Sequence, residues 1–329
     1  VFTATAGATT GPVYQWQVDT GSGFANIAAA GAPNYSGFTT ATLTIGTLSA
    51  ATSGWDYRVV ITGTCPGSVN SNSANLTIDT PAAISAQPSN ATQCETTDAT
   101  FTVTATGTSL SYQWEESTNG GVSWSTVGAN SNSYTKVGVV TADNGNRYRV
   151  TVTSAGACGN NVLSSVATLT VNEAPEVGTQ PVNTTACITG TAVFTSTAGV
   201  TTGPVYQWQV DTGSGFNNIA AAGAAGYAGF TTSTLTINTL SAVATGYQYR
   251  VQITGTCAGT ATSNIAILTV DTPAAISAQP ANDTQCETAD ATFTVTATGT
   301  SLSYQWEEST NGGVSWTSVG ANSNTYTKV

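Results

Sequence analysis

Apolar and polar residues alternate with a period of two along most of this chain. Phe101, Val103 and Ala105 would share one face of an extended segment, and the threonines between them would share the other. The same alternation runs through residues 148–152 and 167–171. Such alternation is typical of half-buried antiparallel strands whose apolar face covers a core. No helical period appears, and the sequence therefore predicts an all-β protein.

Two tripeptides show that the strands belong to a repeated unit. Tyr-Gln-Trp begins at residues 14, 112, 206 and 304, and Tyr-Arg-Val begins at residues 57, 148 and 249. Residues 13–24 recur at 205–216, and residues 81–137 recur from Pro273 with six changes. Two diverged versions of one unit therefore alternate in the order A-B-A-B, which indicates a repeat array. A unit of about 95 residues with some seven short strands has the size of a β-sandwich.

Short linkers that contain proline separate the units, because proline ends one strand and begins the next. They are Asp79-Thr80-Pro81, Glu173-Ala174-Pro175 and Asp271-Thr272-Pro273. We predict four domains: residues 1–79, which lack a first strand, residues 80–172, residues 173–271, and residues 272–329, which stop before the last strands. Since the chain begins inside a predicted strand, we expect it to be cut from a longer protein.

Composition and charge narrow the range of partners. Charged residues make up 7% of the chain, and 17 acidic against 6 basic residues give a net charge of −11. Nucleic acid binding needs clustered Lys and Arg, so we expect no nucleic acid partner. We expect no membrane insertion either, because no apolar run reaches about 18 residues. The chain has no His, the commonest general base and metal ligand.

Candidate catalytic patterns have simpler interpretations. Glu115 and Glu116 are adjacent on a predicted strand, so they point to opposite faces and cannot act as an acid–base pair. Asp19-Thr20-Gly21 and Asp211-Thr212-Gly213 match the loops of aspartic proteases, but they stand where a hairpin turn is expected. We interpret both as turns. The sequence predicts a protein that is not an enzyme and that has no cofactor.

The motifs give the chain a resemblance to a known family. Tyr-Gln-Trp places a Trp on the expected third strand, and Asp143-x-Gly145-x-x-Tyr148 precedes a later strand. The chain resembles the tandem immunoglobulin-like (Ig-like) repeats of large secreted cell-surface adhesin or stalk proteins of Bacteroidota-type bacteria. These share the order Cys, Phe-Thr-Val, Tyr-Gln-Trp, Tyr-Arg-Val, Cys. The resemblance implies Ig-like β-sandwiches in an extended rod. It implies a core Trp in each repeat, at Trp16, Trp114, Trp208 and Trp306, and a tyrosine corner at Tyr57, Tyr148 and Tyr249. The inter-sheet cysteine of antibody domains is replaced by Val59, Val150 and Val251.

The same resemblance implies a function and a location. We expect a structural segment of a long extracellular stalk or filament on a bacterial surface that supports adhesion. Its partners would be adjacent repeats of the same chain, or copies of the protein in a fibre. The alternative is a set of ancillary carbohydrate-binding modules on a secreted polysaccharide-degrading enzyme, with glycan as the partner.

Six cysteines in a chain of this kind suggest disulfides. Cys94, Cys187 and Cys286 precede the second strand of their units, and Cys65, Cys158 and Cys257 follow the Tyr-Arg-Val strand. One interpretation pairs them within domains, as Cys94–Cys158 and Cys187–Cys257. In an Ig-like sandwich, however, the two positions lie at opposite poles, too far apart for a bridge. We favour a bridge between neighbouring domains, Cys94 to Cys257, with Cys65, Cys187 and Cys286 paired outside this chain. Free thiols, or bridges between chains, are the remaining alternative.

Two further groups of residues leave alternatives open. Glu95, Asp98, Glu173 and Glu176 cluster near one linker and could bind joint-stiffening calcium, although solvated surface acids are the preferred interpretation. Trp124, Trp316, Phe24 and Phe216 recur after the glycine turn. They could form an aromatic platform for sugar rings, but we expect them to complete the core at the edge of the sandwich. The Arg of each Tyr-Arg-Val is expected to face outward.

Overall fold

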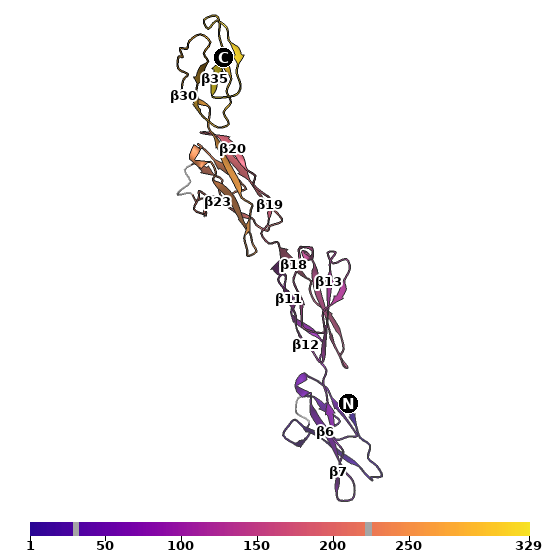
Figure 1. Ribbon diagram of the computed structural model, residues 1–329. Coiled ribbons are helices and arrows are strands. Elements are labelled where there is room, and N and C mark those ends of the chain that lie inside the picture. Colours follow the sequence, from indigo (N-terminus) through magenta and orange to yellow (C-terminus); the bar gives the residue numbers. More distant parts are fainter. Residues whose placement is uncertain (29–32, 221–225) are drawn as a thin grey trace. The chain divides into compact units, whose positions relative to one another are not determined.

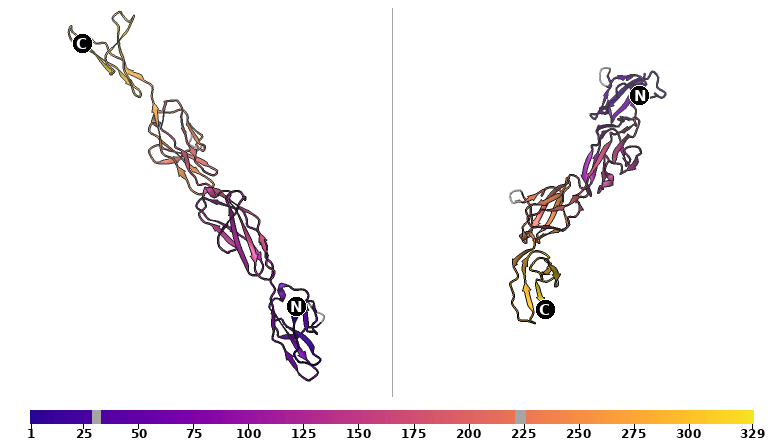
Figure 2. Two further views of the ribbon diagram at one scale, coloured as in Figure 1. Left: turned by 90° about the vertical axis from the view of Figure 1, so that its right-hand side faces the viewer. Right: turned by 90° about the horizontal axis from the view of Figure 1, so that it is seen from above.

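The computed structural model describes residues 1–28, 33–220 and 226–329. Its regular elements in these ranges are β-strands and single turns of 3-10 helix, which confirms the all-β prediction. Each group of strands uses one continuous stretch of the chain, as the colours show (Figures 1 and 2). The chain divides into two compact units, Val1–Val171 and Asn172–Val329, which are described separately.

The first unit begins with a two-sheet sandwich. One sheet has the order β3 (Phe24–Asn26), β2 (Val13–Asp19), β6 (Trp55–Thr62) and β7 (Ser68–Asn70), with β8 (Ala74–Leu76) also paired to β6. The other has the order β1 (Phe2–Thr3), β5 (Thr42–Ile45) and β4 (Tyr35–Ser36). The 3-10 turn η1 (Ala50–Thr52) leads into β6.

A second sandwich follows in the same unit. Its larger sheet has the order β10 (Ala91–Cys94), β18 (Ala167–Asn172), β16 (Arg147–Ser154), β13 (Leu110–Ser117) and β14 (Ser125–Val127), with β17 (Asn161–Leu163) on β16. The strand pairs β11 (Ala99–Thr102) with β15 (Ser133–Lys136) and β9 (Ala83–Ala86) with β12 (Thr104–Thr106) complete it. The turn η2 (Thr141–Asp143) leads into β16.

The second unit repeats this arrangement. One sheet has the order β20 (Thr184–Cys187), β29 (Ala266–Asp271), β27 (Gln248–Thr254), β23 (Val205–Asp211) and β24 (Phe216–Asn218), with β28 (Ala261–Thr262) on β27. Another contains β21 (Ala192–Thr195), β26 (Thr234–Ile237) and β25 (Tyr227–Ala228), and β19 (Val177–Thr179) pairs with β22 (Thr197–Ala198). The turn η4 (Ala242–Ala244) precedes β27. The last strands form the pairs β30 (Ala275–Ala278) with β32 (Thr296–Thr298), β31 (Ala291–Thr294) with β35 (Thr325–Lys328), and β33 (Trp306–Glu308) with β34 (Thr317–Val319).

The pair of β20 and β29 departs from the antiparallel pattern that the alternation predicts. β20 runs parallel to β29, with Thr184 opposite Leu268. The chain leaves β19 in one sheet and enters β20 in another, and Pro181 lies between the two strands. Proline cannot donate a hydrogen bond to a sheet, so this is a suitable position for the crossover.

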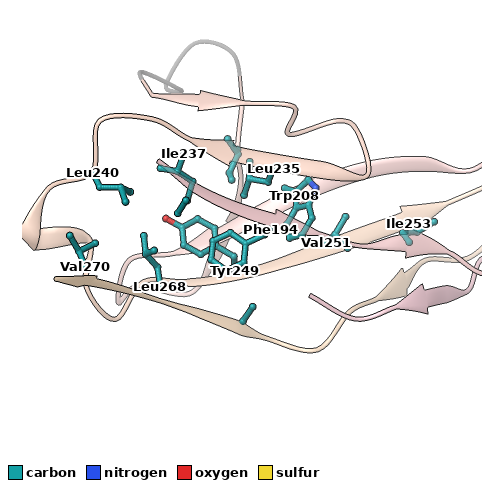
Figure 3. Packing of buried hydrophobic residues seen from close by; sticks show 13 residues of the cluster. Phe194, Trp208, Leu235, Ile237, Leu240, Tyr249, Val251, Ile253, Leu268 and Val270 are labelled. Carbon is teal, nitrogen blue, oxygen red and sulfur yellow. The ribbon is translucent and has the colours of Figure 1, made fainter. Parts of the chain in front are cut away.

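Each complete sandwich has an apolar core of its own, built from the inward-facing residues of both sheets. In the third sandwich the aromatic centre consists of Phe194, Trp208 and Tyr249, each at most 1% exposed (Figure 3). The Phe194 and Tyr249 rings stack with centroids 4.8 Å apart. Val251 lies beside them and is fully buried. Burying large aromatic side chains supplies much of the stability of small β domains.

Candidate functional site

In the three repeats that contain both tripeptides, the Trp of Tyr-Gln-Trp lies on the strand next to Tyr-Arg-Val and faces inward. Trp114 is opposite Val150 across β13 and β16, and Trp16, Trp114 and Trp208 are at most 3% exposed. A buried indole needs a hydrogen-bond acceptor, and each ring nitrogen donates to a backbone carbonyl at about the same place. The acceptors are the carbonyls of Thr40 for Trp16, Ser131 for Trp114, Thr232 for Trp208 and Ser323 for the partly buried Trp306, all at 2.9–3.0 Å. Val59, Val150 and Val251 are fully buried.

The Tyr of each Tyr-Arg-Val is fully buried, but its hydroxyl meets a side chain. Tyr57 and Tyr249 place their hydroxyl oxygens 3.3 and 3.2 Å from those of Tyr35 and Tyr227. Tyr148 instead donates to Glu116 Oε1 at 2.7 Å. A tyrosine corner bonds to upstream backbone, so these positions match the expected tyrosine but have a different partner. Burial is the main cause that raises the pKa of all three hydroxyls.

Glu116 is the centre of a polar cluster in the second sandwich. Its Oε1 lies 3.2 Å from Lys136 Nζ and accepts a hydrogen bond from Asn146 Nδ2 at 3.0 Å. Asp143 Oδ1 lies 3.1 Å from the same Lys136 nitrogen. Burial alone lowers the pKa of Lys136, but the hydrogen bonds with Asp143 and Glu116 raise it above the ordinary value. The sequence patterns above do not predict this cluster. Val18 and Val210 stand at the position of Glu116 in the first and third sandwiches, and a carboxylate at a position that is otherwise apolar was the available signal.

The Arg of each Tyr-Arg-Val faces outward, as predicted, and lies over an aromatic ring. Arg149 is centred 4.0 Å from the Trp124 ring and its Nε lies 2.7 Å from Glu115 Oε2. The same arrangement joins Arg58 to Phe24 and Gln17, and Arg250 to Phe216 and Gln209. Our prediction that these rings complete the core is wrong, because the outward Arg side chains hold them on the outer face of the sheet. Trp316 is 60% exposed.

The cysteines fall into two groups within the described residues. Cys94 and Cys257 are disulfide-bonded. Cys65, Cys158, Cys187 and Cys286 are exposed free thiols. Pairing within domains would join Cys94 to Cys158 and Cys257 to Cys187. Cys158 and Cys187 are free thiols, so the observed states of the cysteines do not match pairing within domains.

The linker residues are bonded to the sandwich that follows them in sequence. Thr80 N donates to Thr108 Oγ1 at 2.8 Å, and Thr108 N donates to the Thr80 carbonyl at 3.0 Å. Thr272 and Thr300 repeat the pair, at 2.9 and 3.1 Å. Asp79 Oδ2 also accepts a hydrogen bond from Ala157 N at 2.7 Å. Such bonds limit the rotation of a linker relative to its domain.

The acidic residues near the linkers have local partners. Asp98 Oδ1 accepts from Gly138 N at 2.8 Å, and Glu95 accepts from the Thr141 hydroxyl. Glu173 and Glu176 donate through their backbone N–H groups to the hydroxyls of Thr202 and Thr201. Across the parts of the chain that the structure covers, no three His, Cys, Asp or Glu side chains are grouped so that they could hold a metal ion.

The two Asp-Thr-Gly sequences form turns. Asp19 Oδ1 accepts hydrogen bonds from the N–H groups of Gly21 and Gly23, at 2.8 and 2.9 Å. Asp211 makes the same two bonds with Gly213 and Gly215, at 2.7 and 2.9 Å. The Gly213 bond is the main cause that lowers the pKa of Asp211. These carboxylates therefore fix the backbone of their own hairpins, as the turn interpretation predicted.

Comparisons with known proteins identify the fold. A family model described as a domain of unknown function, DUF8696, matches residues 83–173. No curated protein matches the sequence. A solved I-band fragment I67–I69 from titin has a TM-score of 0.50 and 14% identity over 79% of this chain and 88% of its own. Drosophila OTK extracellular domains 3–5 align with a TM-score of 0.38 and 17% identity, over 79% and 86% of the two chains.

The likeness to the titin fragment shows that the chain consists of tandem Ig-like domains. Its three repeated β-sandwich units have the sheet pairing described above, and strands β30–β35 follow them. The DUF8696 match lies on the second sandwich. Among the helical turns that the structure describes, none is long and apolar enough to cross a membrane.

Proposed function

We propose that this chain is a structural segment of a long extracellular stalk or filament on a bacterial surface, which supports adhesion and has no catalytic role. The observation that carries the proposal is repetition of self-contained sandwiches. Each complete sandwich has its own buried core, so added units increase length without changing the fold of their neighbours. The partners of this chain would then be the adjacent repeats of the same polypeptide, and copies of the protein where chains assemble into a fibre.

The linkers support a load-bearing role. The Thr80–Thr108 and Thr272–Thr300 pairs fix two of the linkers to the strands that follow them. In each pair one hydrogen bond joins two backbone groups, and the other joins a backbone N–H to a threonine hydroxyl. A linker held in this way resists bending better than a free Gly/Ser-rich linker, which behaves as a random coil. Stiff joints are useful in a stalk, because they keep a terminal domain away from the cell surface.

The cysteines support an extracellular location and a covalent joint. Disulfides persist in oxidising compartments, and Cys94 and Cys257 are disulfide-bonded. We propose that they pair with each other and so connect consecutive domains. The free thiols Cys65, Cys187 and Cys286 would make the equivalent bridges to further repeats.

Glycan binding has weaker support. A sugar-binding platform needs an accessible aromatic face, whereas the Arg149 guanidinium lies over the Trp124 ring. The same position is covered in the first and third sandwiches. Trp316 is exposed, but it lies in the fourth repeat, where the sequence contains no Tyr-Arg-Val strand. The Arg that covers the equivalent ring in the other repeats comes from that strand.

The proposal is tested on native protein sheared from cells and run on a denaturing agarose gel, with and without reductant. A single very large band in both lanes is expected for one long polypeptide stalk. A large band that collapses on reduction would indicate a filament of chains joined through cysteine. Small material in both lanes would contradict a stalk and would support an ancillary module of an enzyme.

A further inference from the structure

The polar cluster of the second sandwich replaces a set of uncharged positions in the other two. Glu116 stands opposite Tyr148 in register, as Val210 stands opposite Tyr249. Lys136 stands opposite Ala99, as Ile237 stands opposite Ala192. The remaining member, Asp143, ends the 3-10 turn η2, where Thr52 ends η1 and Ala244 ends η4. Replacement of all three positions together indicates that the charged residues act as a set.

The geometry brings one amine against two carboxylates. Lys136 Nζ lies 3.1 Å from Asp143 Oδ1 and 3.2 Å from Glu116 Oε1. Asn146 Nδ2 donates to the same two oxygens, at 3.3 and 3.0 Å. Asp143 Oδ2 accepts the backbone N–H of Val140 at 3.0 Å, which fixes the carboxylate plane.

The cluster is largely removed from water. Asp143 and Asn146 are 8% and 4% exposed, and the side chain of Lys136 retains 27% of its accessible surface. The neighbouring Tyr148 is fully buried. An ion pair in such a place must offset a large desolvation cost, whereas a neutral amide would remove both charges.

We propose that Lys136 and Asp143 form an intramolecular amide bond, with Glu116 as the proton carrier. This inference does not depend on the proposed function. The bond would join Lys136 Nζ to Asp143 Cγ and tie strand β15 to the turn that precedes β16. An array under tension would gain a cross-link that neither reduction nor sulfur exchange can break.

The reaction balances without an external reagent. The Lys136 ammonium gives one proton to the Asp143 carboxylate, and the resulting amine attacks Cγ. Glu116 takes a second proton from the nitrogen and returns it to the departing oxygen, which leaves as water. One ammonium and one carboxylate therefore become one secondary amide and one water molecule. Reactants held in close, fixed contact gain effective concentrations of about 10⁵–10⁸ M, and a positioned acid–base group adds about 10²–10⁴-fold.

The test is the intact mass of the full chain after reduction, compared with the mass that the sequence requires. We expect a deficit of one water molecule, and we expect trypsin to leave the bond after Lys136 uncut. Fragment spectra should place the link between Lys136 and Asp143. The fourth repeat, residues 272–329, is an internal control. Lys328 and Glu308, which correspond to Lys136 and Glu116, contact each other there, but no residue of this chain corresponds to Asp143. One deficit is therefore expected, and not two.

Three variants make the test specific. Lys136→Arg should restore the full mass, which a succinimide at Asp143 would not do. Asp143→Asn should lose ammonia instead of water and give the same final mass as the cross-linked parent chain. Glu116→Gln should slow formation of the bond by about 100-fold or more, while circular dichroism shows that the fold is retained. A full-length mass in the folded parent chain would overturn the proposal, as would a link to Asn146.

Discussion

Tyr148 on β16 donates its hydroxyl to Glu116 on β13 at 2.7 Å, inside the core of the second sandwich. In the third sandwich Tyr249 meets the hydroxyl of Tyr227 instead. The same buried phenol is thus satisfied by a carboxylate in one version of the repeat and by a second phenol in the other. The fold is common to both, and the polar chemistry of the core is not.

Removing the Glu116 carboxylate should destabilise the second sandwich. In Glu116→Ala, Lys136, Asn146 and Tyr148 all lose an acceptor inside a largely buried site. We expect the free energy of unfolding to fall by about 3 kcal/mol, as when one partner of a buried ion pair is removed. Chemical denaturation of the chain, followed by the fluorescence of the buried tryptophans, measures the loss.

A matched variant separates the missing carboxylate from general damage to the core. Glu116→Val, Lys136→Ile and Asp143→Thr together introduce the residues of the first sandwich. The triple variant removes the three charged side chains together, and the proposed amide bond with them, so no donor or charge is left without its partner. It should therefore be more stable than Glu116→Ala, because removing one partner of a buried charged set costs more than removing the whole set. A triple variant that is less stable than Glu116→Ala would refute this interpretation of the cluster.

Alkaline solution should destabilise the array. Burial raises the pKa of Tyr57, Tyr148 and Tyr249 in the folded chain, whereas an unfolded tyrosine ionises near pH 10, at about its ordinary pKa. Above about pH 10 the unfolded state therefore binds fewer protons, and stability falls as pH rises.

Urea denaturation between about pH 9 and pH 11 checks this direction. Tyr249→Phe should make the decline shallower in the third sandwich, because the phenol that ionises only on unfolding is gone. A stability that is constant or rises across this range would contradict the buried, protonated state of the three tyrosines.

Arg149 should shield Trp124 from solvent. Its guanidinium covers the ring at 4.0 Å and is held by Glu115. Arg149→Ala should cost only about 0.5–1 kcal/mol, the value of an exposed cation–π contact, but should make Trp124 easier to quench with acrylamide. Difference measurements against Trp124→Phe isolate its signal, and Trp316, which is 60% exposed, serves as the unshielded reference. Equal quenching of Trp124 in the parent chain and in Arg149→Ala would exclude the shielding.

The thiol count of the chain tests the proposed joint. Thiol reagent added to the unfolded, unreduced chain should react with four cysteines, because Cys65, Cys158, Cys187 and Cys286 are free. Digestion without reductant should then release a peptide pair that contains Cys94 and Cys257. A pair that contains Cys94 and Cys158 would show that the bridge lies within one domain.

Much of the fold follows directly from the sequence. The period-two alternation, the recurring Tyr-Gln-Trp and the glycine turns predict sandwiches, because each feature depends on short-range pattern. The outward direction of Arg149 could be predicted for the same reason. The place of Trp124 could not, because its ring follows a turn and its position depends on which side chain from a distant strand covers it.

The polar cluster shows the other limit of sequence reasoning. The strand period predicts that Glu116 points away from Glu115, but no local pattern identifies the partners of Glu116. Lys136 and Asp143 lie 20 and 27 positions after it in sequence. Lys136 is on β15, which pairs with β11, and Asp143 ends the turn η2, so the tertiary fold brings them to Glu116 on β13. A comparison of the two versions of the repeat at each position would have identified Glu116, Lys136 and Asp143 as charged residues where the other version has uncharged ones.

The most direct test of the central claim is to stretch a single chain in the presence of reductant, with handles at its two ends. If the chain is an array of self-contained Ig-like domains, the force trace should show separate unfolding events. Each complete sandwich should give one event that releases about the length of one domain of some 90 to 100 residues. A smooth extension without separate events, or one event that releases the whole chain, would contradict a structural array.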